Sequence, residues 1–218
     1  LAELPESPKV TALTCQTGQS LSSLPSLAQW NLGTYRLLPF WLWQQTLALR
    51  QLQAEWYLSN YYLPPVLPCH SAVVVHDVSF RVLPEFYPTH VALYMRYLVG
   101  WSTRRADLVV TVSEFSRQEL IRCYNLPAEK IAVVPNGIAD RFHPVKEEEG
   151  SARDLEIIGK YGVKPPYIFA LGNIHPRKNL GRLLRAYVRL GDIVPNRPGM
   201  VWGGIERWAS HQLVECAR

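Results

Sequence analysis

The chain has 218 residues, of which 48% are hydrophobic and 19% are charged, and this composition describes a folded protein with a substantial core. It excludes a disordered chain, and no run approaches the ~20 apolar residues of a membrane span. The formal net charge of +5 suits phosphates or nucleotides but is too weak to indicate nucleic-acid binding. The cysteines are far apart and lack metal or redox spacing, so we expect reduced thiols at Cys15, Cys69, Cys123 and Cys216.

Short apolar runs alternate with amphipathic segments over the first part of the chain. The expected strands are Val10–Thr14, Trp56–Leu58, Ser71–Val75, Leu108–Val112 and Ile131–Val134, and the expected helices are Phe40–Glu55, Thr89–Ser102 and Ser113–Tyr124. Ser113 is expected to cap its helix, which would bury Phe115, Leu120, Ile121 and Tyr124. Strands that alternate with helices predict a parallel α/β sheet with right-handed crossovers.

A second strand–helix unit follows an acidic segment. Arg141–Gly162 has little core pattern and predicts a linker. Tyr167–Leu171 predicts a strand buried on both faces, and Asn179 is a suitable N-cap for the amphipathic helix after it. Met200–Trp202 predicts one more strand. The predicted division is an N-terminal domain at 1–140, a linker at 141–163 and the start of a second domain at 164–218.

Ligands of parallel α/β sheets bind beyond the carboxyl ends of the strands. The residues that directly follow the predicted strands are His76, Asp77, Ser113, Asn136, Gly137 and Gly172. Pro135-Asn136-Gly137 is also a turn signal, because Asn and Gly tolerate positive φ. We therefore expect the candidate site at this edge of each sheet.

The chemistry of these residues leaves two interpretations open. His76 with Asp77 could contact a sugar hydroxyl or transfer a proton, or His76 could simply be satisfied by neighbouring backbone. Arg177 and Lys178, beside His175, precede a helix N-terminus and suit a phosphate, but they could equally be solvated surface charges.

Several other site types are absent from the sequence. There is no G-x-G-x-x-G fingerprint, no G-x-x-x-x-G-K-[ST] loop and no G-x-S-x-G elbow, and the histidines show no zinc spacing. A dinucleotide site, a P-loop NTPase, a serine hydrolase of that type and a zinc site are therefore not predicted.

Three segments carry a specific resemblance from about Trp43 to Gly204. VVVHDVSFRVLPEFYP, RRADLVVTVSEFSRQELIRCYNLPAEKIAVVPNGIADRFHP and YIFALGNIHPRKNLGRLLRAY, in this order, closely resemble the retaining GT-B glycosyltransferase family four, the group 1 glycosyltransferases. The resemblance implies two facing Rossmann-like domains with a nucleotide-sugar donor between them. It also implies transfer of a sugar, perhaps mannose or glucose, to a glycan or lipid-linked acceptor, with no metal or other cofactor.

The resemblance also assigns roles by position. His76 matches the histidine that contacts the donor sugar near the reacting centre, and Asp77 adjoins it. Arg177 and Lys178 match the basic pair that neutralises the donor diphosphate, in the loop that begins at Gly172. Ser113, Asn136 and Gly137 are expected at the cleft or hinge. Many members have an arginine where this chain has Asn173, which puts that contact in doubt.

The resemblance is incomplete at both ends. No counterpart of the family's glycine-rich first loop precedes Val10, and no Glu-x7-Glu segment follows Gly204. We therefore expect a truncated glycosyltransferase that is inactive alone. The alternatives are a non-catalytic module that binds an acceptor or a partner chain, and a nucleotide-sugar epimerase. The expected location is the cytoplasm. Trp41 and Trp43 are expected mainly in the core, and the alternative is peripheral contact on the inner face of the membrane through these residues and the Arg104-Arg105 region.

Overall fold

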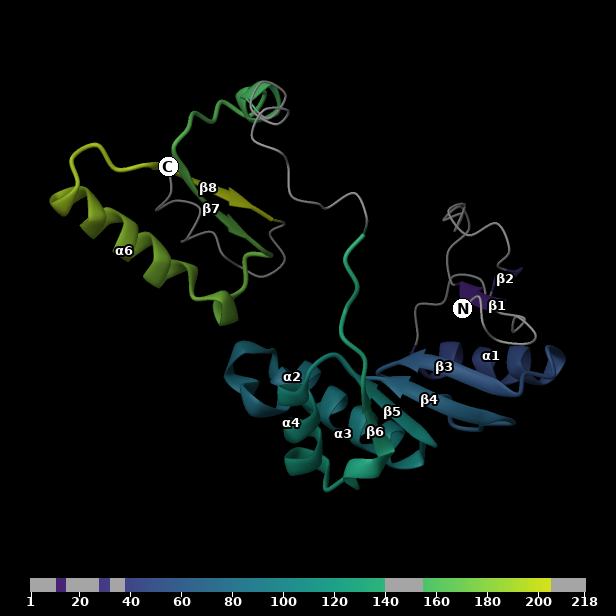
Figure 1. Cartoon of the computed structure of the whole chain (residues 1–218). Helices are drawn as coiled ribbons and strands as arrows, with labels where there is room; N and C mark the ends of the chain where they lie inside the picture. The colour runs from purple at the N-terminus through teal and green to yellow at the C-terminus, as the bar shows by residue number, and fades with distance from the viewer. Residues whose placement is uncertain (1–10, 15–27, 32–37, 140–154, 205–218) are drawn as a thin grey trace. The chain divides into compact units, whose positions relative to one another are not determined.

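The structure is a computed structural model that describes residues 11–14, 28–31, 38–139 and 155–204. The chain divides into two compact units, Leu1–Gly137 and Ile138–Arg218, and each is described by itself (Figure 1). The predicted boundaries at 140 and 163 remain a prediction, since most of the proposed linker lies outside the described residues. Within that segment, residues 155–159 are helical.

The first unit is built on a four-stranded parallel sheet. Its strands are β3 (Trp56–Asn60), β4 (His70–Val74), β5 (Leu108–Thr111) and β6 (Ile131–Val133), hydrogen-bonded in this order. Their register pairs Val73 with Val109 and Val109 with Ile131. The strands are rich in β-branched residues, which suit a pleated and buried surface. The predicted α/β class with a Rossmann-like parallel sheet is confirmed.

Helices connect these strands in the alternation that the sequence predicted (Figure 1). They are α1 (Leu38–Gln51), α2 (Ser79–Val82), η1 (Pro84–Phe86), α3 (Thr89–Arg105), α4 (Glu114–Tyr124) and η2 (Ala128–Lys130). A separate parallel pair, β1 (Thr11–Thr14) and β2 (Ala28–Asn31), precedes them. The predicted elements are thus present with ends shifted by a few residues, whereas β2 and α2 were not predicted.

One hydrophobic core joins α3 and α4 to the sheet. Val73 and Val109 from the strands and Val75, just after β4, pack with Val99 of α3 and Leu120 of α4, and all five are fully buried. Burial of each such side chain contributes about 1.5–3 kcal/mol relative to exposure. This core fixes the strand ends at which the candidate site residues lie.

Helices α3 and α4 are in close contact at Gly100. A Cβ atom there would lie 2.7 and 2.9 Å from two ring carbons of Tyr124, whose side chain is buried. Overpacking of this kind costs about 1–3 kcal/mol, which exceeds the gain of about 1 kcal/mol for alanine over glycine in a helix. We expect Gly100→Ala to lower the free energy of unfolding in urea. Gly137→Ala is the control: its Cβ would meet no atom within 4 Å apart from its chain neighbours, so it should not lower the free energy of unfolding.

The second unit has a two-stranded parallel sheet and a helix. Its elements are β7 (Tyr167–Leu171), η3 (Pro176–Lys178), α6 (Leu180–Ile193) and β8 (Gly199–Gly203). Leu171 is in register with Gly203 at the carboxyl end of the pair. On α6, Leu180 is buried and Val188 is 61% exposed, so the apolar face is narrower than the sequence indicated.

Three predictions of burial are wrong. Phe115 is 72% exposed because Ser116, Leu120 and Tyr124, spaced by four, define the inner face of α4 and position 115 lies on the opposite side. Phe169 in β7 is 55% exposed, so the strand is not buried on both faces. Trp43, expected mainly in the core, is 51% exposed, and the side chain of Trp41 lies outside the described residues.

Two further expectations concern the cysteines and the membrane. Cys69 and Cys123 are free thiols, as predicted, whereas Cys15 and Cys216 lie outside the described residues. Within the part of the chain that the structure describes, no helix is long and apolar enough to cross a bilayer.

Candidate functional site

His76 lies just past the carboxyl end of β4, as the sequence predicted. The preceding residue is held in the sheet, because the Val75 amide donates to the Val110 carbonyl at 2.8 Å. The His76 carbonyl accepts a hydrogen bond from the Ser116 hydroxyl at 2.9 Å, and its ring lies 6.0 Å from the Tyr61 ring, centroid to centroid. The imidazole is partly buried and is therefore held by its surroundings while still reaching solvent.

Asp77 organises the turn that follows. Its carboxylate accepts the Ser79 amide at 2.8 Å and also the Ser79 hydroxyl. The Ser79 hydroxyl lies 2.5 Å from the Tyr87 hydroxyl. These bonds fix the start of α2 directly after His76. A second role for Asp77, in orienting the imidazole, remains a prediction.

Ser113 and Ser116 connect α4 to the same strand end. Ser113 is the N-cap of α4, as predicted, and its hydroxyl accepts the Ser116 amide at 3.1 Å. It also donates to the Ser116 hydroxyl at 3.1 Å, which in turn donates to the His76 carbonyl. Ser113 therefore acts on His76 through Ser116, a residue that sequence reasoning did not single out although it ends the V-S-E-F-S motif.

Tyr61, which follows β3, was also missed. Its φ of +63° is in the left-handed region, where a bulky residue is rare and strained by roughly 1–3 kcal/mol. Burial, followed by the negative charge of Asp77, raises the pKa of Tyr61 to about 12. The backbone amides of Asp77 and His76 act in the opposite direction. The phenol therefore lies against the His76-Asp77 segment in its neutral form.

This environment predicts a pH dependence of stability. The folded state raises the pKa of Tyr61 from 10.0 to about 12, so its contribution to stability is complete below pH 10 and is lost as pH rises toward 12. We expect Tyr61→Phe to reduce the fall in unfolding free energy between pH 10 and 12, measured by urea titration. Tyr97→Phe is the control, because Tyr97 is 70% exposed and should leave that slope unchanged.

Asn136 and Gly137 follow β6 but do not form the predicted turn. Both are exposed, neither has positive φ, and residues 134–139 are irregular. The Val134 amide donates to the Thr111 carbonyl at 2.8 Å, so pairing with β5 continues one residue past the end of β6. The chain then continues without a turn. The predicted turn is therefore wrong, while the hinge role of these residues stays a prediction.

In the second unit, Gly172 and Lys178 lie together at the end of β7. Gly172 has a φ of +144°, a conformation that favours glycine, and its amide donates to the Gly203 carbonyl at 2.8 Å. A Cβ atom at Gly172 would lie 3.7 Å from the Lys178 Cε, so the lysine side chain covers this glycine. At Gly204, a Cβ atom would lie 1.9 Å from the Gly172 carbonyl oxygen, so the two backbones approach closely.

The loop from His175 to Asn179 is ordered by its own backbone. The His175 Nδ1 accepts the Arg177 amide at 3.1 Å. Burial, then the charges of Arg177 and Lys178, lower the pKa of His175, which keeps this nitrogen available as an acceptor. Asn179 occupies the N-cap position of α6, but it has a φ of +54° and its side chain makes no capping bond. The predicted position is right and the predicted capping bond is wrong.

Arg177 and Lys178 are exposed before the first turn of α6. Among residues 155–204, neither cation is in a salt bridge with a carboxylate. Two unpaired cations beside a helix N-terminus form a favourable environment for an anion. Across the described ranges, no group of three His, Cys, Asp or Glu residues could hold a metal ion.

The parallel α/β architecture, with polar residues at the carboxyl ends of its strands, is typical of proteins that bind ligands at that edge of the sheet. The model of Glycosyltransferase Family 4 matches residues 6–142 of the chain. The chain belongs to this family.

Curated relatives match over parts of their length. O-antigen chain mannosyltransferase B of Escherichia coli is 32% identical over 160 residues, which are 72% of this chain and 41% of that protein. O-antigen chain mannosyltransferase RfbU of Salmonella typhimurium is 25% identical over 177 residues, 77% of this chain and 44% of that protein. Serotype-specific mannosyltransferase WbdA of Escherichia coli is 25% identical over 138 residues, which are 62% of this chain and 16% of that protein. The chain thus spans less than half of each of these relatives.

Proposed function

We propose that the complete gene product is a glycosyltransferase that moves a mannosyl group from a nucleotide-sugar donor to a glycan acceptor carried on a lipid, with retention at the anomeric carbon. The observation that carries this proposal is the match of residues 6–142 to Glycosyltransferase Family 4. The choice of mannose is supported by the names of the relatives, which are O-antigen and serotype-specific mannosyltransferases. Retention is supported by the family resemblance of the sequence motifs.

In the proposed reaction, the bond between the anomeric carbon and the diphosphate oxygen breaks. The acceptor hydroxyl oxygen bonds to that carbon and gives up its proton to an oxygen of the departing diphosphate, and the nucleoside diphosphate leaves. His76 would contact the donor sugar, because it is partly exposed at a strand end and held by Ser116 and Tyr61. Arg177 and Lys178 would neutralise the charge that grows on the leaving diphosphate. Because these cations perform that role, we propose that no metal is required.

The test is to incubate the complete gene product with a lipid-linked glycan acceptor and a panel of nucleotide sugars. Transfer from a nucleotide-activated mannose, with the donor's anomeric configuration kept in the product by NMR, is the expected result. Transfer of a different sugar would show that mannose is not the donor sugar, and a product with the opposite anomeric configuration would exclude retention. Binding of the acceptor without transfer of any sugar would instead support the non-catalytic alternative.

We also propose peripheral contact with the inner face of a membrane, where a lipid-linked acceptor would be found. The 51% exposed Trp43 supports this proposal, since an exposed tryptophan suits the polar–apolar boundary of a bilayer. Co-sedimentation with anionic vesicles, reduced in Trp43→Ala, tests it.

A further inference from the structure

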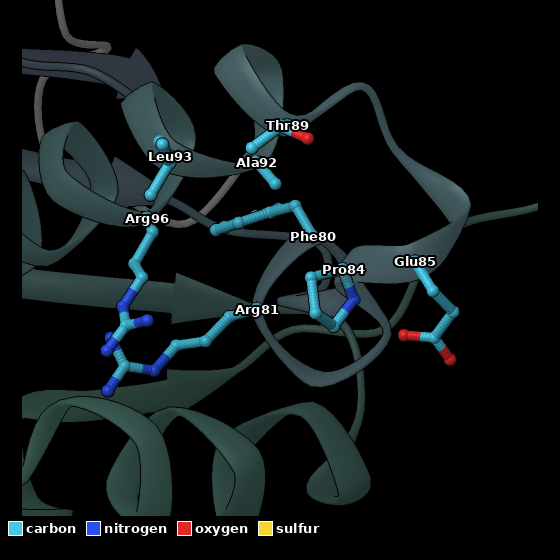
Figure 2. Close-up of a pocket in the computed structure, with 8 residues that line it drawn as sticks. All are labelled: Phe80, Arg81, Pro84, Glu85, Thr89, Ala92, Leu93 and Arg96. Carbon is cyan, nitrogen blue, oxygen red and sulfur yellow. The ribbon is translucent and has the colours of Figure 1, made fainter.

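A pocket of about 310 Å³ lies in the first unit, formed by α2, η1 and the first half of α3 (Figure 2). Four of its eight lining residues are apolar, namely Phe80, Pro84, Ala92 and Leu93. Arg81 and Arg96 lie at one end, where their guanidinium groups converge, and the Glu85 side chain points away from them (Figure 2). The pocket therefore combines an apolar wall with a positively charged end.

Both arginines contact Tyr124 of α4, Arg81 through its side chain and Arg96 through its backbone carbonyl. The Arg81 guanidinium stacks over the Tyr124 ring at 4.7 Å, and the Tyr124 hydroxyl donates to the Arg96 carbonyl at 3.3 Å. Burial raises the pKa of Tyr124 to about 12, while the charges of Arg81 and Arg96 act to lower it. Both cations thus lie close to one neutral phenol.

Among the described residues, no carboxylate pairs with either arginine. In the parts of the chain that the structure describes, neither Arg81 nor Arg96 is in a salt bridge. Two guanidinium groups that converge without a counter-ion repel each other, and an anion placed between them would remove that repulsion. Planar guanidinium groups bind phosphate oxygens with two parallel hydrogen bonds, which favours a phosphate over a smaller anion.

The pocket is next to the segment that carries His76. Helix α2 begins two residues after Asp77, and Phe80 on α2 lines the pocket. The Phe80 ring also packs edge-on against Tyr61, at 6.5 Å between centroids, and Tyr61 packs against His76 at 6.0 Å. Two aromatic rings therefore separate the pocket from the candidate catalytic histidine.

We infer that this pocket binds the phosphate of an acceptor that carries an apolar chain, with Arg81 and Arg96 on the phosphate and the apolar wall on the first carbons of the chain. This inference rests on the proposed function, in which the donor diphosphate is assigned to Arg177 and Lys178 in the second unit. Because the donor diphosphate is assigned to those two residues, we assign the phosphate that Arg81 and Arg96 would bind to the acceptor.

The test is equilibrium binding of decyl phosphate to the 218-residue chain by calorimetry, at concentrations where the ligand is monomeric and without any donor. We expect saturable binding that is at least about tenfold tighter than that of inorganic phosphate or decanol. Arg81→Gln and Arg96→Gln should each weaken it by about tenfold or more, because each removes a charge-assisted pair of hydrogen bonds. Arg105→Gln is the matched control, since Arg105 is on the same helix but stacks on Trp101 at 5.0 Å, away from the lining.

Three outcomes would overturn the inference. They are no saturable binding of decyl phosphate, equal binding of decanol, and equal weakening by Arg105→Gln. Binding to phosphatidylglycerol vesicles that needs both arginines, without binding of decyl phosphate, would also reject it in favour of a membrane headgroup site. Arg96 is exposed, so Arg96→Gln should fold even where loss of the Arg81–Tyr124 stack unfolds the other variant. Because the assay needs no sugar transfer, its failure is distinguishable from failure of the proposed function.

Discussion

Replacing His76 with alanine is expected to lower the turnover number of the complete gene product by about 10²–10³-fold, the usual cost of removing one hydrogen-bond donor that acts at a reacting centre. The backbone of His76 should be unaffected, because its carbonyl accepts from Ser116 whatever its side chain is. The substitution therefore removes the imidazole and little else. The measurement is the rate of sugar transfer at saturating donor and acceptor, compared with the parent protein.

His70 provides a control within the same strand. It is the first residue of β4, its side chain is 67% exposed, and it lies 3.5 Å from Asp107 at the amino end of the sheet. Ligands of parallel sheets bind at the other end, so His70→Ala should keep full turnover. Equal losses in both variants would point to destabilisation, and parental turnover in His76→Ala would remove His76 from the site.

The architecture could be predicted because its signals are local. Runs such as Ser71–Val75 and Leu108–Val112 combine β-branched residues with the length of a buried strand, and Ser113 places a cap directly before a helix. The order of strands and helices then implies a parallel sheet, and the sheet implies which residues share its carboxyl edge. Hence the position of His76 could be derived, although its chemical role could not.

The contacts around His76 depend on the three-dimensional structure. Tyr61 adopts a left-handed backbone conformation that no local pattern predicts for a tyrosine. Ser116 reaches a carbonyl 40 residues away in sequence, because α4 packs where β4 ends. Similarly, Arg81 and Arg96 converge only because α2 and α3 fold around one pocket. Each of these arrangements is created by packing between residues that are far apart in sequence, and local sequence patterns do not reveal such packing.

Burial was predicted less well than secondary structure. The apolar run Tyr167–Leu171 forms the predicted strand, but whether its faces are covered depends on the elements that pack against it and not on its own sequence. Phe115 shows the same limit within a helix, since apolar character alone does not say which side of α4 faces the core. The exposure of Phe115 and of the strand Tyr167–Leu171 is therefore set by the elements that lie beside them in space.

Replacing Arg177 and Lys178 with alanine is expected to weaken binding of a nucleoside diphosphate by the complete gene product. Each charge-assisted hydrogen bond contributes about 1.5–3 kcal/mol, so each single variant should raise the dissociation constant by about 10- to 150-fold. Lys178 is the more constrained of the two, because its side chain lies over Gly172. Arg189→Ala, in the second half of α6, changes the net charge equally and should have little effect. The measurement is the dissociation constant of each variant, determined by calorimetry at two salt concentrations.

Salt separates a phosphate site from a general electrostatic effect. Contacts with the diphosphate itself should leave most of the loss in Lys178→Ala intact at high ionic strength, whereas attraction between distant exposed charges is screened beyond about 10 Å at 0.1 M salt. If Arg189→Ala weakened binding as much as Lys178→Ala, and salt abolished both effects, the two cations would be ordinary surface charges. A loss confined to Arg177 and Lys178 would instead place the leaving diphosphate at the end of β7, where Gly172 and Gly204 bring the backbones together.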